Sequence, residues 1–316
     1  MLGSFSPLRT TNSHLAYWHR GAVARGKIVV STDEATDVFA SDGKHLSTVP
    51  ADRRDLPSLT TLPDGQILAI GGYSSRPVNG VVLASCMLFD VDTLTWTDAP
   101  SLSKARVHHA TVTCNGAVVV IGGCTSLAAD DPGQAFVESW TPGSYRWTPL
   151  PALPRALAYP AAATLTDDSV IVAEDGAWLW DGVDWRELEG APRRSRVALV
   201  PLAKGGVLMI GGRVNGADVA DVDAYIGGAW TSLGPMVEPR EQAAACELGD
   251  GRIVVIGGMG TRMFDRFGAC TDVEVRGPDL DWSRGSGFTV ASPQLVRIDD
   301  ARVLVSGGCA PGIWTP

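Results

Sequence analysis

The chain has little lysine and no long apolar segment. Lys occurs only at positions 27, 44, 104 and 204, and the 316 residues carry 35 Asp and Glu against 26 Lys and Arg. Without a basic stripe to neutralise phosphates, nucleic-acid binding is not expected. No apolar run approaches the roughly 18 residues of a membrane-spanning helix, so no membrane span is expected either.

Metal-binding cysteine patterns and a leader segment are also lacking. The six Cys form no CxxC motif and no Cys/His spacing suited to zinc, which favours reduced and mostly buried thiols. The first 20 residues contain no apolar stretch of signal-peptide length. We therefore expect a cytoplasmic protein, although a chain whose leader had been removed would look the same.

Helical periodicity over ten or more residues is absent, whereas Gly (36) and Pro (20) are abundant. Short β-branched runs ending in Gly-Gly recur along the chain. They are QILAIGG (66–72), AVVVIGG (117–123), GVLMIGG (206–212), RIVVIGG (252–258) and RVLVSGG (302–308). Two weaker copies are KIVVSTD (27–33) and SVIVAED (169–175). Seven copies spaced by about 46 residues predict a repeat protein built of short strands.

Each repeat continues with an aromatic residue and then a Trp. Phe89 and Trp96 are seven residues apart, as are Trp140 and Trp147. Two copies keep the spacing of seven but lack one of the two residue types: Val275 precedes Trp282, and Phe39 precedes Leu46. In two other copies the spacing is five, namely Trp180 with Trp185 and Tyr225 with Trp230. Turn residues divide the third repeat into four expected strands, 106–114, 117–121, 135–140 and 146–150. Four-stranded sheets repeated around an axis form a β-propeller.

The unit of hydrophobic run, Gly-Gly, aromatic residue and Trp resembles the Kelch repeat, and it covers essentially the whole chain. The resemblance implies an all-β, seven-bladed Kelch β-propeller of four-stranded antiparallel blades, and residues 1–316 are expected to form a single domain. Phe5-Ser6-Pro7-Leu8 resembles the fourth-strand sequence Trp147-Thr148-Pro149-Leu150. We therefore predict that an N-terminal strand completes the last blade. The resemblance also implies that the loops from second to third strands share one face with the loops between blades.

An Arg precedes the Gly-Gly position by 16 to 19 residues in five repeats: Arg54, Arg106, Arg155, Arg194 and Arg240. Arg196 lies near this set, and Arg213 directly follows a Gly-Gly. One interpretation is an anion site, because guanidinium groups bind carboxylates and phosphates through paired hydrogen bonds. The other is structural, with each Arg bonding loop carbonyls and neighbouring acids such as Glu238 and Glu241.

The fourth repeat has Glu174 and Asp175 in place of Gly-Gly. Two carboxylates at the end of a buried strand suit general acid/base chemistry, with Trp178 bordering them; the alternative is a decayed repeat with solvated acids. His108, on the first strand of the third repeat, is a further candidate proton carrier, and Tyr159 is its possible partner. For His109 the Kelch resemblance implies a packing role.

The sequence contains no recognisable motif for a cofactor site. The resemblance to Kelch enzymes offers a galactose-oxidase-like copper site and the iron site of plant specifier proteins, but neither residue set is present. Sialic-acid mutarotation is the Kelch activity that fits without a cofactor.

Two hypotheses about function follow from these residues. The propeller binds an anionic ligand, either an acidic peptide or protein segment or a small carboxylate, on an Arg-lined face. Alternatively it is a cofactor-independent isomerase, mutarotase or lyase that uses the same residues.

Overall fold

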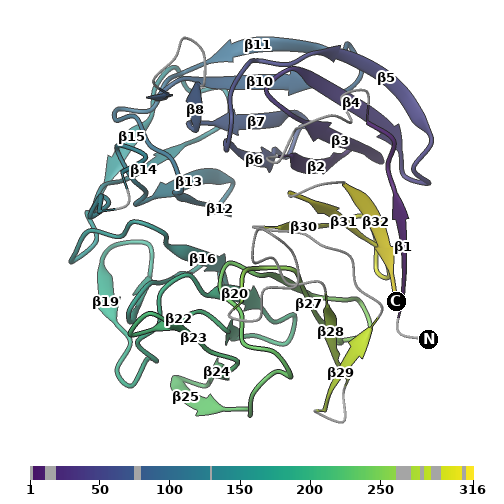
Figure 1. Cartoon of the computed structure of the whole chain (residues 1–316). Coiled ribbons are helices and arrows are strands. Elements are labelled where there is room, and N and C mark those ends of the chain that lie inside the picture. The colour runs from purple at the N-terminus through teal and green to yellow at the C-terminus, as the bar shows by residue number, and fades with distance from the viewer. Residues whose placement is uncertain are drawn as a thin grey trace. The chain divides into compact units, whose positions relative to one another are not determined.

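Seven four-stranded antiparallel sheets make up the part of the chain that the structure describes, and this part contains no helix (Figure 1). The computed structural model describes residues 3–10, 19–74, 80–128, 130–260, 272–277, 281–285, 293–307 and 311–316. The predicted fold class is confirmed: the protein is an all-β, seven-bladed β-propeller. Within these residues no helix is long and apolar enough to cross a membrane.

The blades follow one another along the chain. The first three comprise β2 (Arg20–Ala24), β3 (Lys27–Ser31), β4 (Ala35–Ala40) and β5 (His45–Pro50); β6 (Ser58–Thr61), β7 (Ile67–Ile70), β10 (Cys86–Asp90) and β11 (Thr95–Ala99); and β12 (Ala110–Cys114), β13 (Ala117–Ile121), β14 (Val137–Trp140) and β15 (Thr148–Leu150). The fourth comprises β16 (Ala161–Thr164), β17 (Val170–Ala173), β18 (Ala177–Trp180) and β19 (Trp185–Glu187).

The remaining blades have the same strand order. They comprise β20 (Ala198–Pro201), β21 (Val207–Ile210), β24 (Val222–Ile226) and β25 (Ala229–Ser232); β26 (Ala244–Glu247), β27 (Ile253–Ile256), β28 (Val273–Arg276) and β29 (Trp282–Gly285); and β30 (Gln294–Arg297), β31 (Val303–Ser306), β32 (Gly312–Thr315) and β1 (Ser4–Pro7). Two small hairpins, β8 (Tyr73–Ser74) with β9 (Val81–Val82) and β22 (Arg213–Val214) with β23 (Ala217–Asp218), follow the second strands of their blades.

The strands group into two compact units. The N-terminal unit contains Arg9–Ala162 and Asp181–Trp185, and the C-terminal unit contains Met1–Leu8, Ala163–Trp180 and Arg186–Pro316. Each unit is described by itself below. The single domain expected from the sequence stays a prediction.

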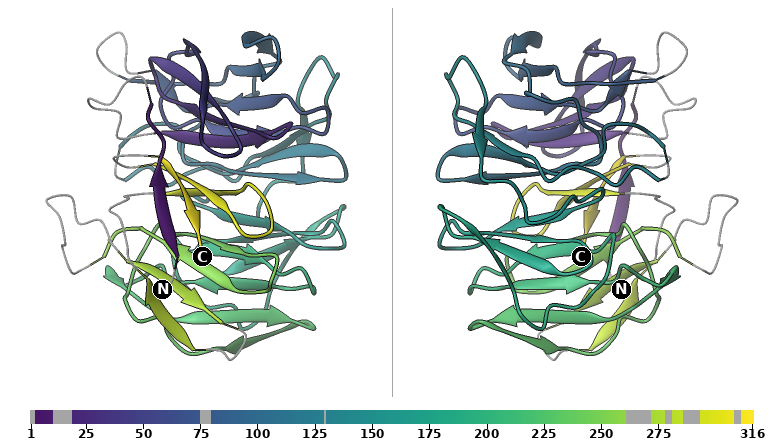
Figure 2. Two further views of the ribbon diagram at one scale, coloured as in Figure 1. Left: turned by 90° about the vertical axis from the view of Figure 1, so that its right-hand side faces the viewer. Right: turned by 90° about the vertical axis from the view of Figure 1, so that its left-hand side faces the viewer.

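The predicted N-terminal closing strand is confirmed. β1 pairs antiparallel with β32, and Figure 2 shows the purple strand beside the yellow ones. In this pairing Phe5 lies opposite Trp314 and Pro7 opposite Gly312. Phe5 packs against the cluster around Trp314, whose side chain is fully buried. Both ends of the described chain therefore belong to one blade of the C-terminal unit.

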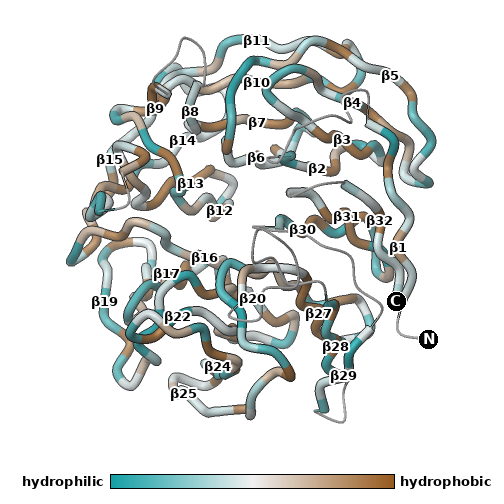
Figure 3. Tube along the Cα trace, in the orientation of Figure 1, coloured by the Kyte–Doolittle hydropathy of each residue, from teal (hydrophilic) through white to brown (hydrophobic). Residues whose placement is uncertain are grey.

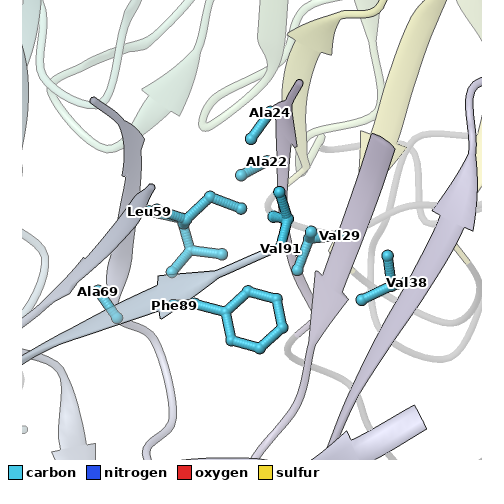
Figure 4. Close-up of a cluster of buried hydrophobic side chains, with 9 residues drawn as sticks. Ala22, Ala24, Val29, Val38, Leu59, Ala69, Phe89 and Val91 are labelled. Atoms are coloured by element: carbon cyan, nitrogen blue, oxygen red, sulfur yellow. The ribbon is translucent and has the colours of Figure 1, made fainter. Parts of the chain in front are cut away.

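The second strand of each blade is buried along almost its whole length. β13 and β31 illustrate this in Figure 3, where both are coloured largely hydrophobic. Figure 4 shows how side chains of the first two blades meet: Phe89 and Leu59 point toward Val29 and Ala22. Burying such surfaces contributes about 25 cal/mol per Å² of apolar area.

The aromatic spacing reflects cross-strand pairing. Phe89 lies opposite Trp96 and Tyr225 opposite Trp230, with ring centroids 4.9 and 5.2 Å apart. Spacings of seven and five both give directly opposed residues because the turns differ in length. Elsewhere the register differs from the sequence spacing. A bulge at Val38 and Phe39 in β4 brings Phe39 opposite His45 instead of Leu46, and in β29 Trp282 lies opposite Arg276 instead of Val275.

The Gly-Gly pair is required by close backbone contacts on both sides. Gly122 and Gly123 have φ of 60° and 91°, a region that other residues adopt only with strain. A Cβ on Gly123 would lie 2.7 Å from the Val107 carbonyl oxygen, and one on Gly122 would lie 2.9 Å from that of Leu157. The pair thus fits between the loop of its own blade and the loop of the next. In the last repeat Gly308 lies outside the described residues.

Candidate functional site

Four segments that begin with the repeated Arg form similar loops, here called the arginine loops. Each comprises the Arg and the three residues that follow it, and the first strand of the blade begins at the next residue. The four loops are 54–57, 106–109, 194–197 and 240–243. The expected strand 106–114 is correspondingly shorter, because β12 begins at Ala110. In the third blade Val107 and Cys124 exchange backbone hydrogen bonds of 3.0 and 2.7 Å. This bridge holds the arginine loop against the residue that follows Gly-Gly.

The bridge recurs in the other arginine loops. The pairs are Asp55 with Tyr73, Ser195 with Arg213, and Glu241 with Met259. Within each unit the loops between blades therefore lie directly beside the loops that follow the second strands. This is the adjacency that the Kelch resemblance implies for its loop face.

The Arg side chains of these loops are buried inside the blades. Arg106 donates from Nη1 to the carbonyls of Gly122 and Phe136, both at 3.1 Å, and from Nη2 to Glu138 Oε1 at 2.8 Å. Neither Arg106 nor Glu138 has any exposed side-chain surface. Burial lowers the pKa of the Arg106 guanidinium, and the Glu138 carboxylate partly offsets that effect.

Three other blades repeat this clamp between the end of the second strand and the start of the third. Arg240 donates to Gly257, Asp272 and the buried Glu274, and Arg194 donates to Met209, Asp221 and Asp223. Arg54 donates to Gly71 and Ser85 and pairs with Asp52. These contacts support the structural alternative for Arg54, Arg106, Arg194 and Arg240. Their role as anion ligands stays a prediction.

The acidic partners were missed at the sequence level, although a signal exists for them. Each is the second residue of a third strand and follows a Val: Glu138 in β14, Asp223 in β24 and Glu274 in β28. An acid that recurs at one position of a buried strand needs a cation. Of the two acids named from the sequence, Glu238 pairs with Arg284, and Glu241 pairs with Arg196 and Arg213.

Two cations that remain partly exposed share one buried carboxylate in the C-terminal unit. Arg213 and Arg196 keep 39% and 29% of their side-chain surface exposed, whereas Glu241 keeps 3%. Arg213 Nη1 lies 3.4 Å and Arg196 Nη1 3.3 Å from Glu241 Oε1. Arg213 also donates to the Gly216 carbonyl at 2.7 Å. Arg155 is exposed as well and belongs to the N-terminal unit.

The acids of the fourth blade occupy the Gly-Gly position. Asp175 has φ of 53° and its backbone N–H donates to the Arg194 carbonyl at 2.7 Å, as that of Gly212 donates to Arg240 at 2.9 Å. Glu174 is buried, and so is Trp178, which has 4% of its surface exposed. Trp178 therefore lies within the blade, and the proton-transfer roles of Glu174 and Asp175 stay predictions.

His108 and Tyr159 are brought together in the N-terminal unit, as the sequence suggested. Their ring centroids are 4.8 Å apart with an interplanar angle of 37°, and His108 has φ of 59°. His109 is different: its Nε2 lies 3.0 Å from Ser58 Oγ, and burial together with the Arg106 charge lowers its pKa to about 3. His109 is therefore neutral at neutral pH, which agrees with a packing role.

Among the described residues no three His, Cys, Asp or Glu side chains are grouped closely enough to hold a metal ion. Such a cluster would have been the simplest indication of a catalytic centre. Two features remain for a site: the Arg pair on Glu241 and the ring contact between His108 and Tyr159.

Comparison with protein families gives a match to the Kelch motif over residues 60–103. Kelch repeat protein M-T8 of Myxoma virus (strain Lausanne) is 24% identical over 271 residues, which is 84% of this chain and 42% of that protein. Kelch-like protein 35 of Mus musculus is 28% identical over 218 residues, which is 63% of this chain and 35% of that protein. The chain thus spans about two fifths of the length of these curated relatives.

Solved structures share the fold. The structure of YjhT aligns with a TM-score of 0.66 and 14% identity, covering 87% of this chain and 99% of that one. A fungal alcohol oxidase of the AA5 family, in complex with copper, aligns with a TM-score of 0.78 and 16% identity, covering 100% of this chain and 77% of that one. At such identities the likeness concerns the fold alone.

Proposed function

Since this chain is a Kelch-repeat β-propeller, we propose that it is an interaction module that binds an anionic ligand, an acidic peptide or protein segment or a small carboxylate, on the loops that carry Arg196 and Arg213. The observation that carries the proposal is the pair of partly exposed Arg196 and Arg213 on the buried Glu241. Function on a rigid scaffold concentrates in loops of this kind.

The shared carboxylate prepares the two guanidinium groups for a ligand. Each guanidinium has five N–H donors in a fixed fork. Nη1 of both Arg196 and Arg213 donates to Glu241 Oε1, and Nε and Nη2 of Arg213 donate to the Gly216 carbonyl. Glu241 also restricts the rotamers of both side chains, which reduces the entropy lost when a ligand binds. A guanidinium group binds a carboxylate better than a chloride ion, because an Arg fork engages two oxygens at once.

The local charge determines how strong the attraction is. Asp218 lies 3.7 Å from Arg213, so Glu241 and Asp218 together balance the two cations. Selectivity then depends on the geometry of the hydrogen bonds, and the affinity is expected to be moderate and dependent on salt. The scattered Arg residues and the charge of −9 argue against nucleic acid as the partner.

Arg213→Ala is expected to lower the affinity for glutarate and for glutamate-containing peptides by about tenfold or more, because a hydrogen bond to a charged group is lost. Titration calorimetry measures the affinity, and the melting temperature should stay within about 2 °C because the side chain is partly exposed. Arg252→Ala is the matched control, since Arg252 pairs with Asp250 in a distant turn with similar exposure. Equal binding by Arg213→Ala and the wild-type protein would contradict the proposal.

A second candidate function is a cofactor-independent isomerase, mutarotase or lyase, and it is favoured by the ring contact between His108 and Tyr159. An imidazole beside a phenol provides two groups that can transfer protons, and general acid/base catalysis contributes about 10²-fold or more. Glu174 and Asp175 are the further carboxylate candidates, in the C-terminal unit.

His108→Gln and Tyr159→Phe are expected to slow turnover of a sugar acid by about 10²-fold while the protein remains folded. Proton NMR of sialic-acid and uronic-acid anomers would measure the rate, with His45→Gln, an exposed His of β5, as the control. Glu174→Gln tests the carboxylate in the same assay. Absence of any turnover by the wild-type protein, or full turnover by both variants, would remove this candidate.

The described thiols support a cytoplasmic location, which we also propose. Cys86, Cys114, Cys124 and Cys246 form no disulfide among the described residues, and the first three are buried. Burial raises the pKa of Cys86 and of Cys246 to about 11, so both are protonated and unreactive at neutral pH. Unreactive thiols that form no disulfide suit a reducing compartment.

A further inference from the structure

Two hairpin turns of the protein share the sequence Asn-Gly-Ala. Asn115-Gly116 joins β12 to β13, and Asn215-Gly216 joins β22 to β23. The two Asn have φ of 49° and 50°, and the two Gly have φ of 74° and 82°. Positive φ at both residues of a two-residue loop is characteristic of a type I′ turn. All four residues are exposed, so the two turns match in sequence, backbone and exposure.

An Asn followed by Gly can react with its own main chain. Because Gly has no Cβ, its backbone nitrogen can closely approach the Asn side-chain carbon Cγ. The Gly N–Cγ bond forms, the bond from Cγ to the amide nitrogen breaks, and the Gly N–H proton leaves with that nitrogen as ammonia. Water then opens the cyclic imide to aspartate or to isoaspartate, in which the main chain runs through the side chain. The conversion needs water and no other reactant.

The two turns differ in how firmly they are held closed. Ring closure requires a rotation about the Asn Cα–C bond, which a closed type I′ turn does not permit, so the hairpin has to open first. β12 and β13 share five residue pairs, and β13 is paired further with β14. The Asn115 amide also donates to Cys114 Sγ at 3.5 Å.

The other hairpin is much smaller. β22 and β23 share two residue pairs and form a two-stranded sheet of their own. A two-stranded hairpin by itself is marginally stable in water, and segments of low local stability open most often. The turn at Asn215 therefore opens far more often than the turn at Asn115.

Asn215 is also directly connected to the Arg pair of the C-terminal unit. Nε and Nη2 of Arg213 donate to the Gly216 carbonyl at 3.0 and 2.7 Å, in an exposed contact that adds little to the stability of the turn. Isoaspartate at position 215 would lengthen the main chain just before Gly216 and displace this carbonyl. It would also add a carboxylate near Arg213, which already faces Glu241 and Asp218.

We infer that Asn215 is a site of spontaneous modification: it converts to isoaspartate as the protein ages, and the new carboxylate takes the Arg213 guanidinium away from Gly216. The conversion is independent of the proposed function. Its consequence for ligand binding rests on that function, because a guanidinium that pairs with residue 215 is less available to an external anion.

The test follows both Asn residues in the intact protein during incubation at neutral pH. Peptide mapping by mass spectrometry measures the conversion, and methyl transfer by a protein isoaspartate methyltransferase detects the isoaspartate. Residue 215 should convert about tenfold or more faster than residue 115. In denaturant the two rates should become similar, since both sites are Asn-Gly-Ala. Asn215→Gly keeps a type I′ turn and should abolish the faster signal, whereas Asn115→Gly should leave it unchanged.

The effect on Arg213 is measured in the same aged samples. The Nε–H resonance of Arg213 in NMR spectra should shift on ageing of the wild-type protein and stay in place in Asn215→Gly. The affinity for glutarate should fall about threefold in the aged wild-type protein, and that of aged Asn215→Gly should equal the affinity of the fresh variant.

Different results would overturn the inference. If residue 115 converts as fast as residue 215 in the folded protein, or if residue 215 stays unmodified, the small hairpin is not a modification site. If the Arg213 resonance shifts equally in aged Asn215→Gly, or stays in place in the aged wild-type protein, the modification does not act on Arg213. If the fresh wild-type protein fails to bind glutarate, the proposed function is contradicted, while the conversion rates and the Arg213 resonance still decide the inference.

Discussion

The Arg106→Ala protein is expected to lose about 3 to 5 kcal/mol of its free energy of unfolding. The substitution leaves the Glu138 carboxylate buried without its cation and removes the donors to the Gly122 and Phe136 carbonyls. A buried charge without a partner is far costlier than a missing surface ion pair. Chemical denaturation measures the loss directly.

The control is Arg146→Ala, which removes an exposed Arg from the same blade and should cost less than about 0.5 kcal/mol. Arg240→Ala should behave like Arg106→Ala, since Arg240 and Glu274 are fully buried and burial raises the pKa of Glu274 despite the nearby cation. If Arg106→Ala were as stable as Arg146→Ala but had lost anion binding, Arg106 would be a ligand-binding residue.

Gly123→Ala is expected to cost about 3 kcal/mol, because two penalties combine. The residue has φ of 91°, and the new Cβ would lie 2.7 Å from both the Val107 carbonyl oxygen and His109 Cβ. The loop 106–109 would have to move, and with it His108. Denaturant titration and the near-ultraviolet circular dichroism of the aromatic residues would report both effects.

Two substitutions separate the penalties. Gly116→Ala has similar backbone strain with φ of 74°, but nothing lies within 4 Å of its Cβ, so about 1 kcal/mol is expected. Asp175→Gly is the reverse change at the corresponding position of the fourth blade, and it should leave stability unchanged or raise it. If Gly116→Ala cost as much as Gly123→Ala, the close contact would not be the reason for Gly-Gly.

The recurring features of the chain were predictable because they depend on local physics. Seven apolar runs predicted seven second strands, and Phe5-Ser6-Pro7-Leu8 predicted the strand that pairs with β32. The aromatic and Trp spacing predicted opposed rings where the turns are regular, as for Phe89 and Trp96. It failed for Phe39, because a β-bulge shifts the register by one residue without any marked change of composition.

The candidate site was only partly predictable. The contact between His108 and Tyr159 was predictable, because they occupy related places in consecutive blades, whereas their role in proton transfer stays a prediction. The five Arg looked equivalent in the sequence, yet Arg106 is buried against Glu138 while Arg155 is exposed. The offset from Gly-Gly, 19 residues for Arg155 against 16 or 17 for the others, was the available sign of this difference.

The sequence by itself determined the all-β repeat, the number of blades and the places of Gly-Gly, since strand formation, turns and backbone freedom are local properties. Only the tertiary structure decided which cations are buried and which face solvent. A guanidinium lies at the end of a long flexible side chain, and whether it meets a carboxylate depends on residues about 30 positions away in the sequence. The same geometry explains part of the low lysine content and the abundance of Arg. At four loops a planar guanidinium donates hydrogen bonds to the ends of two strands and pairs with an acid. A lysine ammonium would make this set of contacts less well.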